Sequence, residues 1–448
     1  MAMKSTAQAA TKFRIGHSRI THPSDEGQRV YRRLTLLFAG LILVGAVAGI
    51  VIPAGPGWDF ANFFDTGRRV AARQIADLYN PDSLIAGAQP QGKLGFYGTP
   101  VSALLYAPLG LLTPSWAMIV FKIQNTLAYF AALALLYRHN RKFVENSVAG
   151  QWRFAALFSG LSLLYQPFWT IYRVGGQSTP TVLLLFVLAL IFHTNSRFLA
   201  SASCIVAAVL IKPAFIFALA LLVCTSGGRF FRYTLMLLGG VGLVSVLLLG
   251  WGIHEEFLRT MLRANQTSYA WFYNSSLYVI AENMKLLGEG AGQNALWKLS
   301  TIMVKLMSLA LCVYLLVKSR TSKLSQSARR HFDFLTAIVF CLLVSQTVWE
   351  HYLAVLFPLL AYVAASHRYF SRSALALAGA IFLLAAWQNL IVINFLRANF
   401  HFDTAPELVL IGLCKSAPLW LTAIFLWRSH KEFFGSYAVP VWRLTEES

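Results

Sequence analysis

Long apolar stretches alternate with short polar loops along most of this 448-residue chain. Many of the apolar stretches approach the roughly 20 residues that a helix needs to cross a bilayer. The pattern predicts an all-α polytopic membrane protein with about 10 to 13 transmembrane helices. The predicted spans are Leu34–Pro53, Pro100–Leu112, Trp116–Leu136, Phe154–Ile171, Thr179–His193, Leu199–Cys224, Leu235–Trp251, Leu299–Val317, Phe334–Val348, Tyr352–Ala365, Ala374–Asn394 and Leu408–Trp427.

Some of these stretches are short for a full crossing, notably Pro100–Leu112 and Tyr352–Ala365. Another, Leu199–Cys224, is interrupted by Lys212-Pro213. Proline removes a helical hydrogen bond, so this point predicts either a bent helix or a short hairpin.

Composition agrees with the pattern, since 57% of the residues are hydrophobic and only 12% are charged. A net charge of +20 would suggest nucleic-acid binding in a soluble protein. Here the lysines and arginines gather in short loops, which is typical of the cytoplasmic side of a membrane protein, so we expect membrane lipids and no nucleic acid as partners. The five cysteines lie within or at the ends of apolar stretches and predict no disulfide or metal framework.

The basic loops predict a cytoplasmic segment 1–33, a membrane domain 34–427 and a cytoplasmic tail 428–448. Leu34–Pro53 is expected to be an uncleaved first helix. Two segments of about 40 residues, 58–97 and 254–298, are predicted on the external face, with amphipathic helices along the membrane surface. The basic loop 138–153 is inconsistent with this count if every predicted span crosses. The expected location is a bacterial inner membrane, with the active site facing the periplasm.

Candidate chemistry begins directly after the first span, where Asp59 is followed by Asp65, Arg68, Arg69 and Arg73. A carboxylate and several guanidinium groups at a lipid boundary are costly to keep there. They suit a reaction in which an acceptor hydroxyl loses a proton while a lipid-linked phosphate is bound. Asp59 is the predicted general base, with an N-cap as the alternative role and Asp65 as a second candidate.

Short motifs follow in a fixed order and lie at predicted external edges. They are Leu78-Tyr79-Asn80-Pro81, Phe96-Tyr97-Gly98-Thr99-Pro100, Gly176-Gln177, Lys212-Pro213, Asn274-Ser275-Ser276-Leu277 and Trp349-Glu350-His351-Tyr352. In this order the motifs resemble those of glycosyltransferase family 87, polyprenol-phosphate-mannose-dependent mannosyltransferases of the C-type glycosyltransferase fold.

The resemblance implies inverting transfer of a hexose, mannose by analogy, from a polyprenyl-phosphate-sugar donor to a lipid or glycan acceptor. It identifies His351 as a catalytic residue beside Asp59. Candidate donor phosphate ligands are Arg68, Arg69, Arg73 and Lys212, and candidate sugar or acceptor ligands are Asp65, Gln177, Asn274, Ser276 and Glu350.

Each candidate also has an ordinary structural reading. The arginines are also explained as a solvated or snorkelling face, Lys212 as half of a buried ion pair, His351 as an interfacial residue, and Asn274 and Ser276 as loop caps. No Asp-x-Asp motif or nucleotide-binding glycine loop is present, so neither a metal nor another cofactor is predicted. The alternative functions are a transporter or flippase of an amphipathic anion and an O-antigen-ligase-like transferase.

Overall fold

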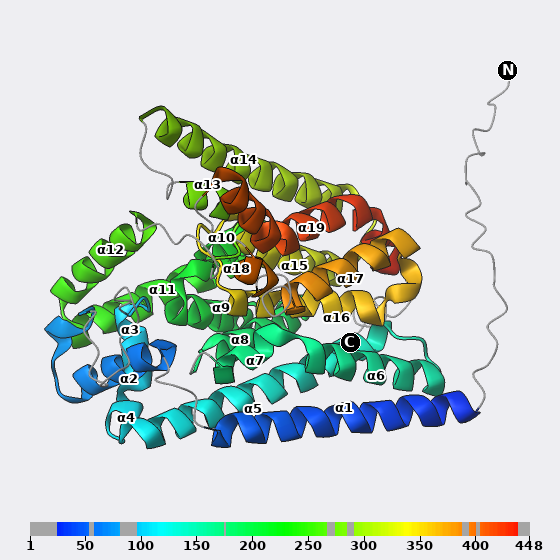
Figure 1. The fold of residues 1–448 in the computed structure, drawn as a ribbon, viewed down its shortest axis with the longest axis horizontal. Helices are drawn as coiled ribbons and strands as arrows, with labels where there is room; N and C mark the ends of the chain where they lie inside the picture. Colours follow the sequence, from blue (N-terminus) through cyan, green and yellow to red (C-terminus); the bar gives the residue numbers. More distant parts are fainter. Residues whose placement is uncertain are drawn as a thin grey trace.

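The computed structural model describes residues 25–52, 58–80, 96–173, 176–266, 274–284, 291–387, 394–399 and 404–437. Within these ranges the chain forms helices joined by turns, with an isolated bridge between Asn274 and Trp349. The longest helices, α1, α5, α14 and α19, run in broadly the same direction across the bundle (Figure 1). The elements are α1 Asp25–Val51, α2 Trp58–Ala71, η1 Ile75–Asp77, α3 Pro100–Ala103, η2 Leu104–Tyr106, α4 Ala107–Gly110, α5 Pro114–Asn140, η3 Arg141–Phe143, α6 Val148–Leu164, α7 Gln166–Arg173, α8 Thr179–Thr194, α9 Phe198–Ile211, η4 Pro213–Phe215, α10 Ile216–Thr225, α11 Gly228–Leu249, α12 Trp251–Gln266, α13 Val279–Met284, α14 Ala291–Thr321, α15 Gln326–Val344, η7 Glu350–Leu356, α16 Phe357–Ala365, η8 His367–Tyr369, α17 Arg372–Trp387, α18 Asn394–Asn399 and α19 Ala405–Tyr437.

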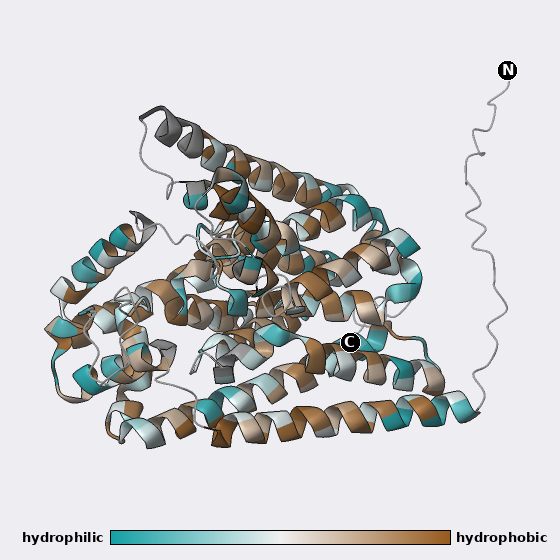
Figure 2. Ribbon diagram, viewed as in Figure 1, coloured by the Kyte–Doolittle hydropathy of each residue, from teal (hydrophilic) through white to brown (hydrophobic). Residues whose placement is uncertain are grey.

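The prediction of an all-α polytopic membrane protein is confirmed. In the described part of the chain, five helices are long and apolar enough to cross a membrane: Glu26–Val51, Pro114–Phe143, Gly228–Leu249, Leu299–Thr321 and Ala405–Tyr437. Large apolar side chains on α1, α11 and α14 point outward, including Leu36, Leu247 and Leu306, and hydrophobic residues colour the lengths of α1 and α14 in Figure 2. Such faces are stable against lipid chains and would be unstable against water.

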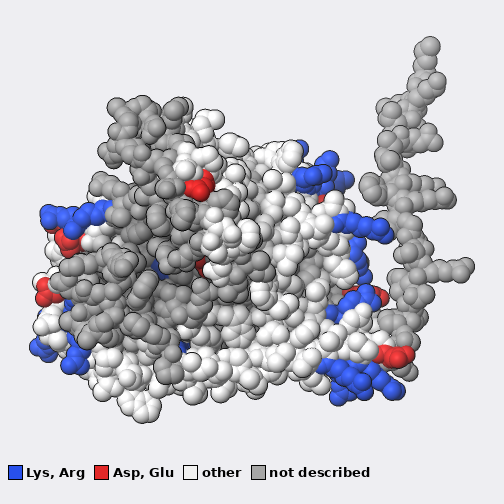
Figure 3. All heavy atoms as spheres, in the orientation of Figure 1, with Lys and Arg blue, Asp and Glu red and all other residues white. Residues whose placement is uncertain are grey.

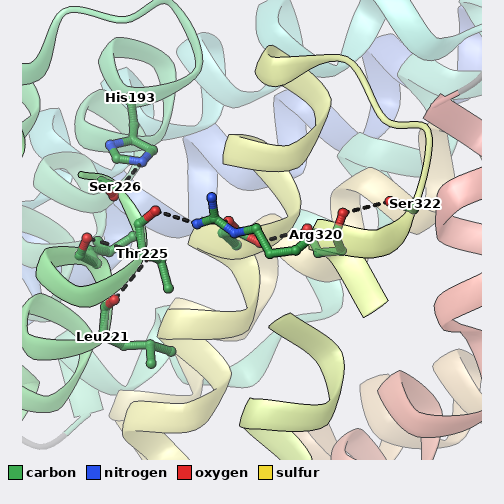
Figure 4. Close-up of polar contacts among 9 residues, drawn as sticks. His193, Leu221, Thr225, Ser226, Arg320 and Ser322 are labelled. Carbon is green, nitrogen blue, oxygen red and sulfur yellow. Dashed lines mark hydrogen bonds and ion pairs between the residues drawn. The ribbon is translucent and has the colours of Figure 1, made fainter. Parts of the chain in front are cut away.

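Basic residues gather where α1 begins and where α14 and α19 end, and we call this side the basic end. Lysines and arginines lie at this side, on the right in Figure 3, and at the far left, with an uncharged band between. Polar side chains connect the helix ends here. Arg320 of α14 donates to the Thr225 carbonyl of α10 and pairs with Asp333 of α15 (Figure 4). Ser226 Oγ lies 3.0 Å from His193 Nε2, within hydrogen-bond distance.

The loop 138–153 lies at the basic end, because the His139 ring stacks on His331 of α15 with centroids 5.3 Å apart. The predicted span Pro100–Leu112 is therefore wrong. The segment folds into the short elements α3, η2 and α4, which pack on α2. Gly67 and Gly110 permit this packing, since a Cβ at Gly67 would lie 2.0 Å from the Tyr106 carbonyl oxygen. Once this segment does not cross, the basic loop agrees with the other basic loops.

Other boundaries differ from the sequence pattern by smaller amounts. The helix α14 begins at Ala291, before the predicted start of the apolar span at Leu299. The helix α19 continues to Tyr437, beyond the predicted end of its span at Trp427. In both cases polar residues extend a helix past its apolar part, which hydropathy alone does not detect.

Lys212-Pro213 forms the tip of a hairpin rather than a bend. The helix α9 has 14 residues and α10 has 10 residues, which gives lengths of about 21 and 15 Å. Both are shorter than the apolar thickness of about 30 Å in a bilayer. Since α10 ends at the basic end, the tip at Lys212 lies within the depth of the membrane domain rather than at its surface.

The first external segment packs into a hydrophobic cluster that it shares with α5 and α12 and that is rich in aromatic residues: Phe60, Phe64, Leu78, Tyr79, Phe96, Ala103, Tyr106, Leu109, Ala117, Phe121 and Ile253. The Tyr79 ring stacks on Phe96 at 5.9 Å, and the Tyr79 hydroxyl donates to the Gly98 carbonyl at 2.9 Å. Burial raises the pKa of Tyr79 well above its ordinary value, so the hydroxyl stays protonated and donates this bond.

Candidate functional site

Lys212 is the centre of a buried polar cluster at the tip of the α9–α10 hairpin. Its ammonium donates to Gln177 Oε1 at 3.1 Å and lies 3.1 Å from His351 Nε2. It also lies 4.4 Å from the centroid of the Tyr352 ring. Because an ammonium has no acceptor, His351 Nε2 accepts this bond and the imidazole carries its proton on Nδ1. Three residues proposed from different motifs therefore meet at one point.

Both hydrogen-bond partners named above are neutral groups. The Gln177 amide oxygen and the His351 imidazole orient the ammonium from two sides of the cluster. All three side chains are buried, with exposed fractions of 8% for Lys212, 3% for Gln177 and 8% for His351. A cation in such surroundings attracts an anion much more strongly than it would in water.

The segment that provides Gln177 also contacts the start of α2. Gly176 has φ +100°, and a Cβ there would lie 3.1 Å from Phe60 Cβ and 3.1 Å from the Phe121 ring. Only glycine fits easily in this conformation and space. Asp59 is the second residue of α2 and precedes Phe60, although its side chain lies outside the described part of the structure. The main chain of the predicted base is thereby placed beside the Lys212 cluster.

The remaining early motifs reach the same region through main-chain contacts. Thr99 donates to the Leu210 carbonyl twice, from its amide at 3.2 Å and from its hydroxyl at 2.8 Å. Leu210 lies two residues before Lys212. Since Tyr79 is bonded to Gly98, the chain from Tyr79 through Thr99 connects α2 to the hairpin tip.

A narrow crevice of about 150 Å³ lies beside Gln177 and has no room for a water molecule. Lys122, on its lining, donates to the Gly49 and Ile52 carbonyls and so caps the end of α1. The other lining residues are Phe121, Asn125, Tyr172 and Gly176.

The three arginines of the first external segment are used differently from Lys212. Arg68 donates to the Gly110 carbonyl at 2.9 Å and Arg69 to the Asn80 carbonyl at 2.8 Å. Arg73 is exposed and has φ +59°. It occupies the left-handed position of a Schellman motif, in which Arg73 N–H bonds Val70 O and Gln74 N–H bonds Arg69 O. Their described contacts are structural, and their phosphate-binding role stays a prediction.

The residues predicted to bind sugar or acceptor differ in the contacts that hold them. Asp65 is buried on α2 with 4% exposed. The Asn274 carboxamide oxygen accepts from the Ser276 and Val348 amides at 2.9 and 3.1 Å, which is the loop-capping geometry. Ser276 Oγ is buried and, among the described residues, has no hydrogen-bond partner. Gln177, by contrast, accepts the hydrogen bond from Lys212.

Glu350 reveals a residue that sequence reasoning missed. Lys415 of α19 donates to Glu350 Oε1 at 3.1 Å, and its side chain is 0% exposed. The sequence offered one signal, a lone lysine within the apolar run Leu408–Trp427. In addition, Gln346 Nε2 donates to Glu282 Oε1 at 3.5 Å. No group of three or more potential metal ligands is found within the described ranges.

Comparison with known proteins identifies the family. The profile of Glycosyltransferase family 87 matches residues 96–345, more than half of the chain. The chain belongs to glycosyltransferase family 87. This confirms the resemblance to the family, and the chain is an integral membrane glycosyltransferase. The matched residues include Gln177, Lys212 and Asn274, whereas Asp59, His351 and Lys415 lie outside the matched range.

Among solved structures, the family 87 chain matches the crystal structure of ArnT from Cupriavidus metallidurans bound to undecaprenyl phosphate. The two are 14% identical, with a TM-score of 0.37, over 88% of this chain and 77% of the other. None of the curated proteins matches the sequence.

Proposed function

We propose that this family 87 member transfers a hexose from a polyprenyl-phosphate-sugar donor to a lipid or glycan acceptor, with inversion at the anomeric carbon. The observation that carries the proposal is the buried Lys212 ammonium, oriented by Gln177 and His351 at the tip of a hairpin that is too short to cross the membrane. A lipid-linked phosphate enters from the bilayer and needs a cation at this depth.

In the proposed reaction, the acceptor hydroxyl attacks the anomeric carbon on the face opposite the phosphate. The bond between that carbon and the phosphate oxygen breaks, and its electron pair leaves with polyprenyl phosphate. Lys212, with His351 beside it, stabilises the negative charge that develops on the leaving phosphate. Asp59 takes the acceptor proton, and no general acid is needed because the phosphate leaves as a stable anion.

The proposed location is the bacterial inner membrane, with the Lys212 cluster facing the periplasm. The support is the course of the hairpin, since α10 runs from the tip at Lys212 to the basic end, where Arg320 contacts the Thr225 carbonyl. Mannose is the proposed sugar by family analogy, and the acceptor is proposed as a class only.

The test is a transfer assay with purified protein in detergent, where there is no membrane across which a substrate could be transported. Polyprenyl phosphates carrying radiolabelled mannose, glucose or galactose are incubated with total membrane lipid, and labelled products are separated and digested with linkage-specific glycosidases. We expect a labelled glycolipid or glycan of inverted configuration with one of the donors, and none with Lys212→Met.

Two results would contradict the proposal. Consumption of a polyprenyl-diphosphate glycan, with every monophosphate donor inert, would support the O-antigen-ligase-like function. Binding of the donors without any turnover in detergent, combined with their movement across vesicle membranes, would support a flippase.

A further inference from the structure

We propose that Lys415 is a positioning residue for the transfer reaction: its ion pair with Glu350 anchors the start of η7 and so holds His351 against Lys212. The part that concerns catalysis rests on the proposed function, whereas the anchoring itself does not. Lys415 contacts Glu350, which is the first residue of η7, and His351 follows directly.

The segment before His351 is held from two sides. On one side, Asn274 pairs with Trp349 in an isolated bridge, and the Ser275 amide donates to the Val348 carbonyl at 2.7 Å. On the other side, Lys415 pairs with Glu350 at 3.1 Å. Glu350 and His351 therefore each contact a different lysine, and the short spacing between them couples the two contacts.

The position of Lys415 is itself well defined. A Cβ at Gly412 would lie 2.7 Å from Ile280 Cγ1 and 3.0 Å from Ile280 Cα, so α19 packs closely on α13. Asn283 of α13 also donates to the Leu408 carbonyl of α19 at 3.1 Å. These contacts hold the part of α19 that carries Lys415 against α13.

Burial strengthens the coupling. The Lys415 side chain is fully buried and the Glu350 side chain is 18% exposed. Removing one partner of such a pair leaves the other charge uncompensated, whereas replacing both partners with neutral residues is much less costly. Loss of Lys415 should therefore move Glu350 toward water and carry His351 away from Lys212.

The first readout does not depend on transferase activity. Diethyl pyrocarbonate modifies neutral imidazole nitrogens, and peptide mass spectrometry measures the rate at His351. In the wild-type protein His351 is buried and bonded to Lys212, so we expect slow modification. We expect modification several times faster in Lys415→Met and in the neutral pair Glu350→Gln/Lys415→Met, and a rate close to wild type in Lys415→Arg. The neutral pair keeps the test valid if Lys415→Met does not fold.

The second readout is a double-mutant cycle in kcat/KM between Lys415→Met and His351→Ala. If Lys415 acts through His351, Lys415→Met should lower kcat/KM about 10- to 100-fold alone and have little further effect when His351 is already alanine. A folded Lys415→Met protein with His351 modified at the wild-type rate would overturn the proposal, and so would additive losses in the cycle. A wild-type protein without transferase activity would refute the proposed function, and the modification rates would then decide the anchoring alone.

Discussion

The arginines of the first external segment and the lysine at the hairpin tip show how differently similar charges are used. Arg68 and Arg69 donate to carbonyl groups at the ends of neighbouring elements, and Arg73 closes a helix C-terminus. Lys212 is buried and bonds the side chains of Gln177 and His351, which come from two other motifs. In the sequence, the three arginines form the denser cationic group. Arg69 is also buried, at 5%, so contact with the side chains of two other motifs, rather than burial or charge density, marks Lys212 as the stronger candidate for phosphate binding.

The largest expected effect tests what the first external segment contributes besides structure. Asp59→Asn keeps the size and most of the hydrogen bonding of the side chain but removes the base. We expect a folded protein that binds donor and loses turnover by about 10²- to 10⁴-fold, measured in single-turnover transfer assays. Near-normal turnover would assign the base to Asp65, for which Asp65→Asn is the matched variant, or would favour the transporter.

The next effect tests the comparison directly. Lys212→Met removes the buried ammonium and keeps an apolar stem, so donor binding should weaken by about 1.5–3 kcal/mol, the range for charge-assisted hydrogen bonds. Arg68→Gln is the matched control and should leave donor affinity unchanged. Isothermal titration with polyprenyl phosphate measures both variants.

If Arg68→Gln weakens binding and Lys212→Met does not, the comparison is reversed and the phosphate lies on α2. If neither variant changes donor affinity, and Arg69→Ala and Arg73→Ala also leave it unchanged, other cations must bind the phosphate. Arg173 and Lys93 are then the candidates, and both side chains lie outside the described residues.

A third test concerns the packing that brings the first external segment to the site. A Cβ at Gly67 would overlap the Tyr106 carbonyl oxygen at 2.0 Å, so Gly67→Ala should destabilise the protein by about 1–3 kcal/mol, the range for overpacking. Gly240→Ala is the control, because nothing lies within 4 Å of its added Cβ, and a helical alanine is favoured over glycine. Thermal unfolding in detergent measures both. Equal melting temperatures would mean that α2 and α4 are not packed as described.

The smallest effect sharpens the role of Arg73. Glycine adopts a positive φ without steric cost, so Arg73→Gly should stabilise the segment by up to about 1 kcal/mol if Arg73 serves only the Schellman motif. Donor affinity should not change. A loss of affinity together with the gain in melting temperature would return Arg73 to the phosphate site.

Several features could be predicted from the sequence because they depend on local pattern. Asn274 was identified in a short motif, yet only the structure shows its carboxamide bonded to the main chain of residues 276 and 348. Lys212-Pro213 was predicted to interrupt a span, since proline breaks a helix wherever it lies. The structure shows a hairpin rather than a bend, because α10 returns to the basic end, where Arg320 donates to the Thr225 carbonyl.

The sequence by itself determined the membrane class, the basic loops and the motif residues, because apolar length, charge and proline act locally along the chain. Tertiary structure alone decided that Pro100–Leu112 does not cross, that Lys212 rather than Arg68 is buried, and that Lys415 pairs with Glu350. Residues 350 and 415 are far apart in sequence, and α19 carries no motif that connects them. Their pairing follows from the packing of α19 on α13, where Gly412 lies against Ile280, and a hydropathy pattern contains no information about which neighbour a helix contacts.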